Sequence, residues 1–409
     1  MKALRIVFLG SAPEWSSSYI RSFFLGKYLV ERGHMVSLIA TSRKATLNAN
    51  RKIVDGVNVF LLPSLVASNT SLFFNWLSKA STVFVQTPLN SILEATFDFD
   101  ILHSFDVMFP QNATPTLLSR ISCFLRIHDQ KIFVDWDDWW GGGMITQHAR
   151  VYAHGGIWSL IDPVVTFLEE KVPRYADAVT VSAQTLRQRA LRVGVKPENL
   201  FVLPNGADVD SIKPLDICDA RTKLGLPMNK IIYTQAGILD QESFELLILA
   251  HKKVVKSYPD ALLLLVGKIH TKQLDFLKSL NMTRKVIYVG WQPDDNFRLY
   301  LGASDVFLLP MRDSAYDRAR WPLRLGDYLA AGRPTVATAL PEIKKVVSEC
   351  GLLAKPDDPE DFANKLLEVI RDPDLREKMG KRARELAERK YSWQILAKQL
   401  EKIYTHARA

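Results

Sequence analysis

Apolar and polar positions follow one another along this chain in a repeating order: a short apolar run, a polar loop, and then a segment with helical spacing. Residues 3–10 are almost all apolar and predict a buried strand, residues 19–31 carry apolar side chains at helical spacing, and residues 35–40 predict a second strand. A strand, a loop, a helix and a strand in this order predict the start of a doubly wound parallel sheet.

The same order returns in the second half of the chain. A helix is predicted over residues 243–258, and the predicted strands are residues 230–237, 261–267, 286–290 and 306–310. The run 261–267 is apolar at nearly every position, as expected of a strand buried on both faces. The chain is therefore predicted to be an α/β protein with two sheets. The dinucleotide fingerprint G-x-G-x-x-G is absent from the first loop, which argues against a nicotinamide or flavin enzyme.

A loop, a helix and a strand are predicted between residues 312 and 338. Pro322 suits the first turn of a helix over residues 323–331, and Gly332 ends that helix. The helix start follows a loop rich in arginine, and we expect Arg318, Arg320 and Arg324 to gather there. Free backbone N–H groups, the positive end of the helix dipole and guanidinium groups together suit an anion such as a diphosphate. The alternative is a solvated, charged loop.

A second concentration of charge ends the strand predicted over residues 132–138. Asp135, Asp137 and Asp138 stand at its carboxyl end, where ligands bind in open α/β sheets. A carboxylate at this position can orient a hydroxyl group or stabilise developing positive charge. The alternative is a cluster that caps or forms a turn. The glycines that follow, at 141–143, predict a hinge beneath two tryptophans.

Residues 61–93 are apolar and aromatic, and Lys79 is the one basic residue in the segment. One interpretation is an amphipathic segment that binds a membrane surface and brings the protein to a lipid-linked acceptor. The other is an ordinary core helix packed on the sheet, which the shortage of basic residues favours.

Length and charge narrow the range of functions. A chain of 409 residues predicts two domains, and a net charge of +9 predicts anionic partners such as nucleotide sugars, anionic lipids or nucleic acid. Three isolated cysteines indicate a reducing compartment, and we expect a cytoplasmic protein with neither a signal peptide nor a membrane span. No continuous basic stripe with interleaved aromatic residues supports nucleic-acid binding.

Residues 322–334 carry a more specific pattern, Pro-Leu-Arg-Leu-Gly-Asp-Tyr-Leu-Ala-Ala-Gly-Arg-Pro. This stretch resembles the donor-site motif of the group 1 family of retaining, sugar-nucleotide-dependent glycosyltransferases, which includes glycogen-synthase-like enzymes. The resemblance implies the GT-B fold, in which two Rossmann-like domains face each other across a cleft. It also implies that Asp327 hydrogen-bonds the ribose of the nucleotide and that Arg324, with Arg320, faces the diphosphate.

The resemblance assigns the two domains as well. Residues 1–210, with 391–409 packing back on them, would hold the acceptor, and residues 211–390 would hold the nucleotide sugar. Asp137 takes the place of a histidine that lies close to the donor's anomeric carbon in related enzymes. The further residues expected to contact substrate are Gly10, Asp138, Asn205, Gly237, Lys268, Trp291 and Arg318.

Two departures from the family pattern bear on activity. No basic residue stands between residues 234 and 250, where the family places an Arg and a Lys on the diphosphate; here Ile238 follows Gly237, and Glu242 stands near the lysine position. Ala319 replaces a carboxylate near the donor sugar.

The Asp-x-Asp pattern at 135–137 also matches the metal motif of the other major glycosyltransferase fold, GT-A. Two carboxylates alone make a poor metal site, and we predict neither a bound metal nor a cofactor.

These patterns predict a glycosyltransferase that moves a sugar from a nucleotide-diphosphate sugar to a hydroxyl of a glycan or lipid-linked acceptor, with retention of configuration. The expected catalytic residues are Asp137, Arg320 and Arg324. The departures keep open an alternative, a non-catalytic nucleotide-sugar-binding or scaffolding subunit. A sugar-nucleotide epimerase on the same fold would need acid and base residues that the motifs do not contain. The membrane-binding interpretation of residues 61–93 implies peripheral attachment to the cytoplasmic membrane face.

Overall fold

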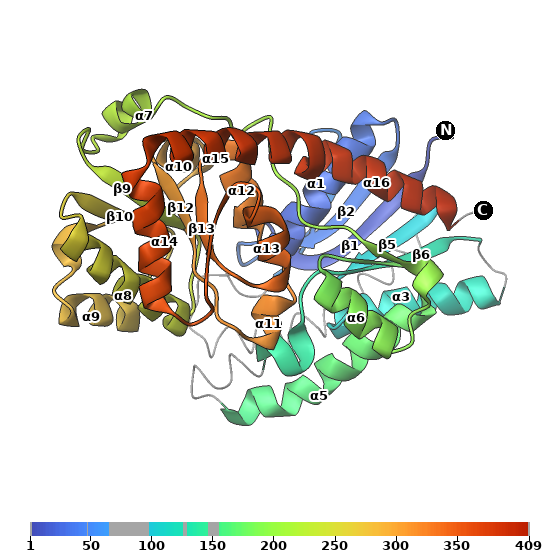
Figure 1. The fold of residues 1–409 in the computed structure, drawn as a ribbon. Helices are drawn as coiled ribbons and strands as arrows, with labels where there is room; N and C mark the ends of the chain where they lie inside the picture. The colour runs from blue at the N-terminus through green and yellow to red at the C-terminus, as the bar shows by residue number, and fades with distance from the viewer. Residues whose placement is uncertain (1, 47, 65–97, 126–128, 146–154, 408–409) are drawn as a thin grey trace. The chain divides into compact units, whose positions relative to one another are not determined.

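The computed structural model describes residues 2–46, 48–64, 98–125, 129–145 and 155–407. The chain forms two compact units, one made of Met1–Pro204 with Trp393–Ala409 and the other of Asn205–Ser392. Each unit is a sheet with helices packed against it, so the α/β class predicted from the sequence is confirmed (Figure 1). The interpretations of residues 61–93 as a membrane-binding segment or as a core helix concern a stretch that lies, from residue 65 on, outside the described residues.

The first unit is built on a sheet with the strand order β3-β4-β2-β1-β5-β6-β7-β8. Its strands are β1 (Arg5–Pro13), β2 (Met35–Thr41), β3 (Asn50–Val54), β4 (Val57–Leu62), β5 (Ile101–Phe105), β6 (Lys131–Trp136), β7 (Ala178–Val181) and β8 (Leu200–Val202). Neighbouring strands are parallel except β3 and β4, which form an antiparallel hairpin. Because the chain moves from β1 to β2 on one side and later to β5 on the other, the topological switch point lies between β1 and β5.

The helices of the first unit follow the apolar spacing of the sequence. They are α1 (Ser17–Glu31), α3 (Pro110–Phe124), α5 (Gly155–Lys171), α6 (Gln184–Arg192) and α16 (Trp393–His406), with shorter turns at Trp140–Met144, Val172–Tyr175 and Pro197–Asn199. Helix α1 begins two residues before the predicted start because the Ser16 side chain accepts a hydrogen bond from the Tyr19 N–H and caps the helix.

The C-terminal helix α16 packs on the first unit although it comes last in the sequence. The Trp393 ring stacks on Phe24 with a centroid distance of 5.6 Å. Glu401 pairs with Arg32 and His34 of the first unit. Buried Tyr404, further along the helix, lies 2.7 Å from the His103 ring on β5. Apolar stacking and charge pairing along α16 thus join it to α1, to the residues directly after α1 and to β5.

The second unit is built on a parallel sheet with the order β11-β10-β9-β12-β13-β14. Its strands are β9 (Ile231–Ala236), β10 (Ala261–Val266), β11 (Val286–Gly290), β12 (Val306–Leu309), β13 (Thr335–Thr338) and β14 (Gly351–Ala354). Its helices are α7 (Ile217–Leu224), α8 (Gln241–Ser257), α9 (Thr271–Ser279), α10 (Asp294–Gly302), α11 (Ala315–Arg318), α12 (Leu323–Ala331), α13 (Pro341–Val347), α14 (Pro359–Arg371) and α15 (Pro373–Leu386), with turns at Thr283–Lys285 and Ala387–Tyr391. The switch point here lies between β9 and β12.

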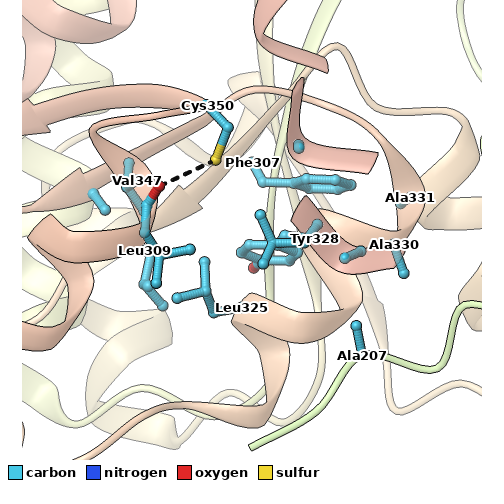
Figure 2. Close-up of a cluster of buried hydrophobic side chains, with 14 of the residues drawn as sticks. Ala207, Phe307, Leu309, Leu325, Tyr328, Ala330, Ala331, Val347 and Cys350 are labelled. Carbon is cyan, nitrogen blue, oxygen red and sulfur yellow. Dashed lines mark hydrogen bonds between the residues drawn. The ribbon is translucent and has the colours of Figure 1, made fainter. Parts of the chain in front are cut away.

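The core of the second unit holds helix α12 against strands β9 and β12. Figure 2 shows the Phe307 and Tyr328 rings among buried aliphatic side chains, and the two rings stack with a centroid distance of 4.2 Å. The buried Tyr328 hydroxyl accepts a hydrogen bond from the Ala236 N–H at 2.8 Å and donates one to the Leu308 carbonyl at 3.3 Å. One side chain of α12 therefore fixes the helix against the ends of two strands.

Among the described helices, none combines the length and the hydropathy that a membrane span requires.

Candidate functional site

Three adjacent strands of the second unit end in glycine at the carboxyl edge of the sheet. Gly290 is the last residue of β11, while Gly267 and Gly237 directly follow β10 and β9. Their φ angles are 68°, 141° and 89°. The Gly267 N–H donates to the Gly290 carbonyl, and the Gly237 N–H donates to the Val266 carbonyl, both at 2.8 Å. A Cβ atom on Gly267 would lie 2.5 Å from the Gly237 carbonyl oxygen, so a side chain does not fit there. We call these three residues the glycine floor, a backbone surface that a ligand can approach closely.

Arg324 lies against this floor at the start of α12. Its guanidinium donates to the Ala236 carbonyl at 3.1 Å and to the Ile238 carbonyl at 3.0 Å. A Cβ atom added to Gly237 would lie 3.4 Å from the Arg324 Cζ atom, so the guanidinium covers the glycine. Helix α12 begins after Pro322, and its first backbone N–H groups lack carbonyl partners within the helix.

The charge of Arg324 has no carboxylate partner among the residues that the structure describes. Burial lowers the pKa of this guanidinium below its ordinary value, and the nearby charge of Arg320 lowers it further. Within the part of the chain that the structure describes, its polar contacts are the two backbone carbonyls, and no aspartate or glutamate forms an ion pair with it. Two hydrogen bonds leave the rest of its five N–H donors for a ligand. A partly buried cation without a counter-ion, beside a helix start, is the arrangement that an anion completes.

The other arginines of the loop are each paired with a carboxylate. Arg320 lies 2.8 Å from buried Asp317, and its guanidinium also stacks over the Tyr316 ring at 4.6 Å. Arg318 pairs with Asp313 and is half exposed. Of the three arginines predicted to gather, Arg320 lies near enough for its charge to act on Arg324. Arg318 ends the short helix α11, where the sequence predicts a loop, and is half exposed.

Two further charges bear on the missing Arg and Lys of the family pattern. Glu242, near the lysine position, pairs with Arg312 at 3.1 Å, so it belongs to a surface ion pair. Lys268 directly follows Gly267 at the end of β10 and is exposed. It lines a small pocket with glycine-floor residues and the side chains of Gln235 and Gln273. Lys268 is thus a second cation at the carboxyl edge of this sheet.

Asp327, Asn205 and Trp291 lie around the same edge. Burial raises the pKa of Asp327 to about 7, and the charge of Asp208 acts in the same direction. The Asn205 amide donates to the Trp321 carbonyl at 2.7 Å and so holds the residue before Pro322 in place. Trp291 directly follows Gly290, and its side chain is 66% exposed.

The first unit has an acidic edge, but Asp135 is not at its tip. Asp135 lies within β6 and is fully buried, and the Arg21 guanidinium donates to both of its carboxylate oxygens at 2.8 and 2.9 Å. Thr180 on β7 donates to the same carboxylate at 2.5 Å. Of the two aspartates in the Asp-x-Asp pattern, Asp135 is thus engaged in a buried ion pair, and Asp137 follows the end of β6. Among the described residues, no group of three or more potential ligands could hold a metal ion.

Asp137 and Asp138 follow the end of β6, as predicted. Asp137 is 7% exposed, and its backbone carbonyl accepts a hydrogen bond from Ser182. Burial raises the pKa of Asp137 well above its ordinary value, and the charges of Asp106, Asp138 and Asp135 raise it further. Gly10 lies within β1 beside Phe105, on the other side of the switch point.

Asp106 belongs to this edge and was missed by the sequence analysis. It directly follows β5, adopts a left-handed backbone with φ of 52° and is 6% exposed. Burial raises the pKa of Asp106 to about 6, while a hydrogen bond from Ser18 opposes the rise. An aspartate directly after a buried strand was the signal that could have identified it.

The tryptophan and glycine segment after Asp138 is hydrogen-bonded to its neighbours, and the hinge predicted there stays a prediction. The buried Glu169 carboxylate accepts hydrogen bonds from the backbone N–H groups of Trp140 and Gly141 at 2.8 and 2.9 Å. The Arg189 guanidinium lies 4.2 Å from the Trp139 ring centroid. A Cβ atom on Gly141 would lie 2.5 Å from the Thr166 backbone, so this glycine permits close packing against α5.

Comparison with known proteins decides the family. Residues 216–386 match the family described as glycosyl transferases group 1, and residues 23–211 match glycosyltransferase family 4. The chain belongs to the group 1 glycosyltransferase family. The resemblance predicted from residues 322–334 is confirmed, and so is the GT-B fold.

This group 1 glycosyltransferase is similar to a GDP-mannose-dependent monoacylated alpha-(1-6)-phosphatidylinositol monomannoside mannosyltransferase of Corynebacterium glutamicum, with 26% identity over 62% of this chain and 68% of the relative. This chain matches 68% of the length of that mannosyltransferase, and 59% and 50% of the length of two D-inositol 3-phosphate glycosyltransferases from other Corynebacterium species. Sucrose-phosphate synthase from Thermosynechococcus elongatus superposes with a TM-score of 0.74 at 18% identity over 98% of both chains. Anabaena HepE in complex with UDP-glucose gives a TM-score of 0.66 at 15% identity over 98% of this chain and 99% of HepE.

Proposed function

We propose that this protein transfers a sugar from a nucleotide-diphosphate sugar to a hydroxyl of a glycan or lipid-linked acceptor, with retention of configuration. The observation that carries the proposal is the Arg324 guanidinium, which lies on the glycine floor at the start of α12 and has no carboxylate partner among the described residues. A diphosphate would meet charge-assisted N–H donors and a helix start at one place.

The second unit would hold the donor. Arg324 binds the diphosphate, while Arg320 and exposed Lys268 add positive charge from the neighbouring loop and strand. Asp327 accepts hydrogen bonds from the ribose, and the exposed Trp291 ring packs on the nucleobase. Similarity to a protein solved with UDP-glucose supports a nucleotide-sugar donor.

The reaction would proceed on one face of the donor sugar. The bond between the anomeric carbon and the diphosphate oxygen breaks while the acceptor oxygen bonds to the same face of that carbon. The acceptor proton passes to the departing diphosphate oxygen, whose negative charge is stabilised by Arg324 and the start of α12. Asp137 would stabilise positive charge that develops on the sugar ring, a role that requires its ionised form.

The first unit would hold the acceptor at its acidic edge, with Gly10 and Asp138 lining the same edge. A relative that acts on an acylated phosphatidylinositol mannoside supports a lipid-linked glycan as one acceptor class. With such an acceptor the protein would work at the cytoplasmic face of a membrane as a peripheral protein.

A transfer assay tests the proposal. The purified protein is incubated with UDP-, GDP- and ADP-sugars and a panel of glycan acceptors, and both nucleoside diphosphate release and the anomeric configuration of the product are measured. We expect turnover with at least one donor and an α-linked product from an α-configured donor. A β-linked product from that donor would refute retention, and a product that is merely an isomerised donor would indicate an epimerase.

The second candidate is a non-catalytic nucleotide-sugar-binding or scaffolding subunit. It is favoured by the absence of basic residues between 234 and 250 and by Ala319, which is fully buried where the family has a carboxylate. This candidate predicts tight nucleotide-sugar binding without donor hydrolysis or transfer. The same assay, run beside calorimetric donor binding, separates the two.

A further inference from the structure

The acidic edge of the first unit contains a pair of carboxyl groups from adjacent strands. Strands β5 and β6 are parallel neighbours, with Phe105 opposite Asp135. Asp106 directly follows β5, and Asp137 follows β6, so both lie at the carboxyl edge of the sheet beside the switch point. Parallel pairing of these strands is therefore what brings the two side chains together.

Side chains of neighbouring residues fix the position of Asp106, and within the described residues one of its two carboxylate oxygens has no hydrogen-bond partner. The Asn112 amide donates to the Phe105 carbonyl at 2.7 Å, which fixes the residue before Asp106, and Ser18 hydrogen-bonds to the Asp106 side chain. The Asp106 Oδ1 atom is buried, and within the described residues it has no hydrogen-bond partner. A buried carboxylate oxygen without a partner is costly, and a ligand donor would satisfy it.

The nearest opposing charge is already engaged. Arg21 acts on Asp137, but its guanidinium donates to both Asp135 oxygens and to the carbonyls of Leu203 and Pro204. Burial raises the pKa of Asp137 most, and the charge of Asp106 raises it more than the charge of any other residue does. A raised pKa favours the protonated form of a carboxyl group, which donates a hydrogen bond, whereas an ionised carboxylate accepts one. A hydroxyl group matches this arrangement because it both donates and accepts.

We propose that Asp106 is a specificity-determining residue, and that the acidic edge which it forms with Asp137 binds the acceptor through hydroxyl groups and disfavours a phosphomonoester next to the reacting hydroxyl. This inference rests on the proposed function, because it assigns the acceptor to the first unit. The acceptor class is then a sugar or polyol that is uncharged around its reacting end. Among the described residues, a phosphate dianion would meet these carboxylates while the Arg21 guanidinium is already hydrogen-bonded to Asp135.

Matched acceptor pairs test this. Glucose and myo-inositol are each compared with their monophosphates, with donor turnover measured as kcat/KM. The wild type should prefer the unphosphorylated member of each pair by about tenfold or more, since like charges placed together are strongly disfavoured. Asp106→Asn keeps the shape, tolerates the left-handed backbone and should reduce this preference by about fivefold or more. Asp55→Asn is the control, because Asp55 also has a positive φ, 47°, but lies exposed in the β3–β4 turn.

The outcomes separate this inference from the proposed function. If the wild type turns over no donor, the transferase proposal fails, and calorimetric binding of the same acceptor pairs then decides the inference about the acidic edge. A preference for the phosphorylated members, or a preference that Asp106→Asn leaves unchanged, would overturn it. If Asp106→Asn does not fold, Asp137→Asn removes the other half of the pair and should reduce the preference in the same direction.

Discussion

The Arg21 guanidinium and the Asp135 carboxylate form two hydrogen bonds of 2.8 and 2.9 Å, and both side chains have no solvent exposure. The pair joins α1 to β6 across 114 sequence positions. Arg21 also donates to the Leu203 and Pro204 carbonyls, at the last residues before the second unit begins. The pair therefore organises the centre of the first unit beneath its acidic edge.

Removal of one partner should be costly. Arg21→Met leaves the Asp135 carboxylate buried without its cation, and we expect the unfolding free energy of the first unit to fall by about 3–5 kcal/mol. The measurement is urea unfolding followed by tryptophan fluorescence. The double variant Arg21→Met/Asp135→Leu should recover a large part of the loss, since no buried charge is left unpaired. Arg51→Met, at an exposed site on β3, is the control. A loss below about 1 kcal/mol for Arg21→Met would contradict this account.

The glycine floor predicts unequal effects of the same substitution. Gly267→Ala places a Cβ atom 2.5 Å from a backbone oxygen, whereas Gly290→Ala meets nothing within 4 Å, although both glycines have positive φ. Both variants bear the cost of the left-handed backbone, about 1–2 kcal/mol. Gly267→Ala should lose at least about 1 kcal/mol more in unfolding free energy, because the backbone has to move. Equal losses in urea unfolding would show that the close approach of β9 and β10 is not required.

Asp327 predicts a pH-dependent contribution to stability. Its pKa is raised from 3.8 to about 7 in the folded state, so between these values the folded protein binds more protons than the unfolded chain. This contribution to stability is therefore present at acidic pH and declines as pH rises to about 7. Asp327→Asn lacks the ionisation, and its unfolding free energy relative to the wild type should rise by about 1–3 kcal/mol between pH 5 and pH 8.

The control for this titration is Asp275→Asn, since Asp275 is exposed on α9. Its difference from the wild type should stay constant over the same pH range. A constant difference for Asp327→Asn as well would mean that Asp327 titrates like a solvated carboxyl group.

Much of the second unit could be predicted because its signals are local. Helix α12 has the predicted bounds, Leu323–Ala331, since Pro322 precedes it and Gly332 ends it with φ of 67°. The hairpin of β3 and β4 carried an equally local signal that the sequence analysis did not use. Asp55 and Gly56 form a two-residue turn in which both residues have positive φ, as such hairpins require.

The first unit's site depended on pairing that the local sequence does not contain. The sequence predicts Asp135 at the carboxyl end of a strand, because acidic residues cluster there. In the structure Asp135 is buried in an ion pair with Arg21, which is distant in the sequence. The loop arginines show the same limit: Arg318 and Arg320 lie close to Arg324 in the sequence, and their ion pairs with Asp313 and Asp317 distinguish them from it. Which charges remain unpaired is a property of the folded chain.

The most direct test of the central claim is calorimetric binding of UDP, GDP and ADP to the wild type and to Arg324→Met, with Arg382→Met as a control on α15, where Arg382 is exposed and paired with Glu349. The wild type should bind at least one of the three nucleotides. Arg324→Met should weaken this binding by about 30-fold or more, since charge-assisted hydrogen bonds contribute about 1.5–3 kcal/mol each. The control variant should change the affinity by less than about threefold, since it leaves these hydrogen bonds intact. Equal affinity of the wild type and Arg324→Met, with both proteins folded, would contradict the central claim.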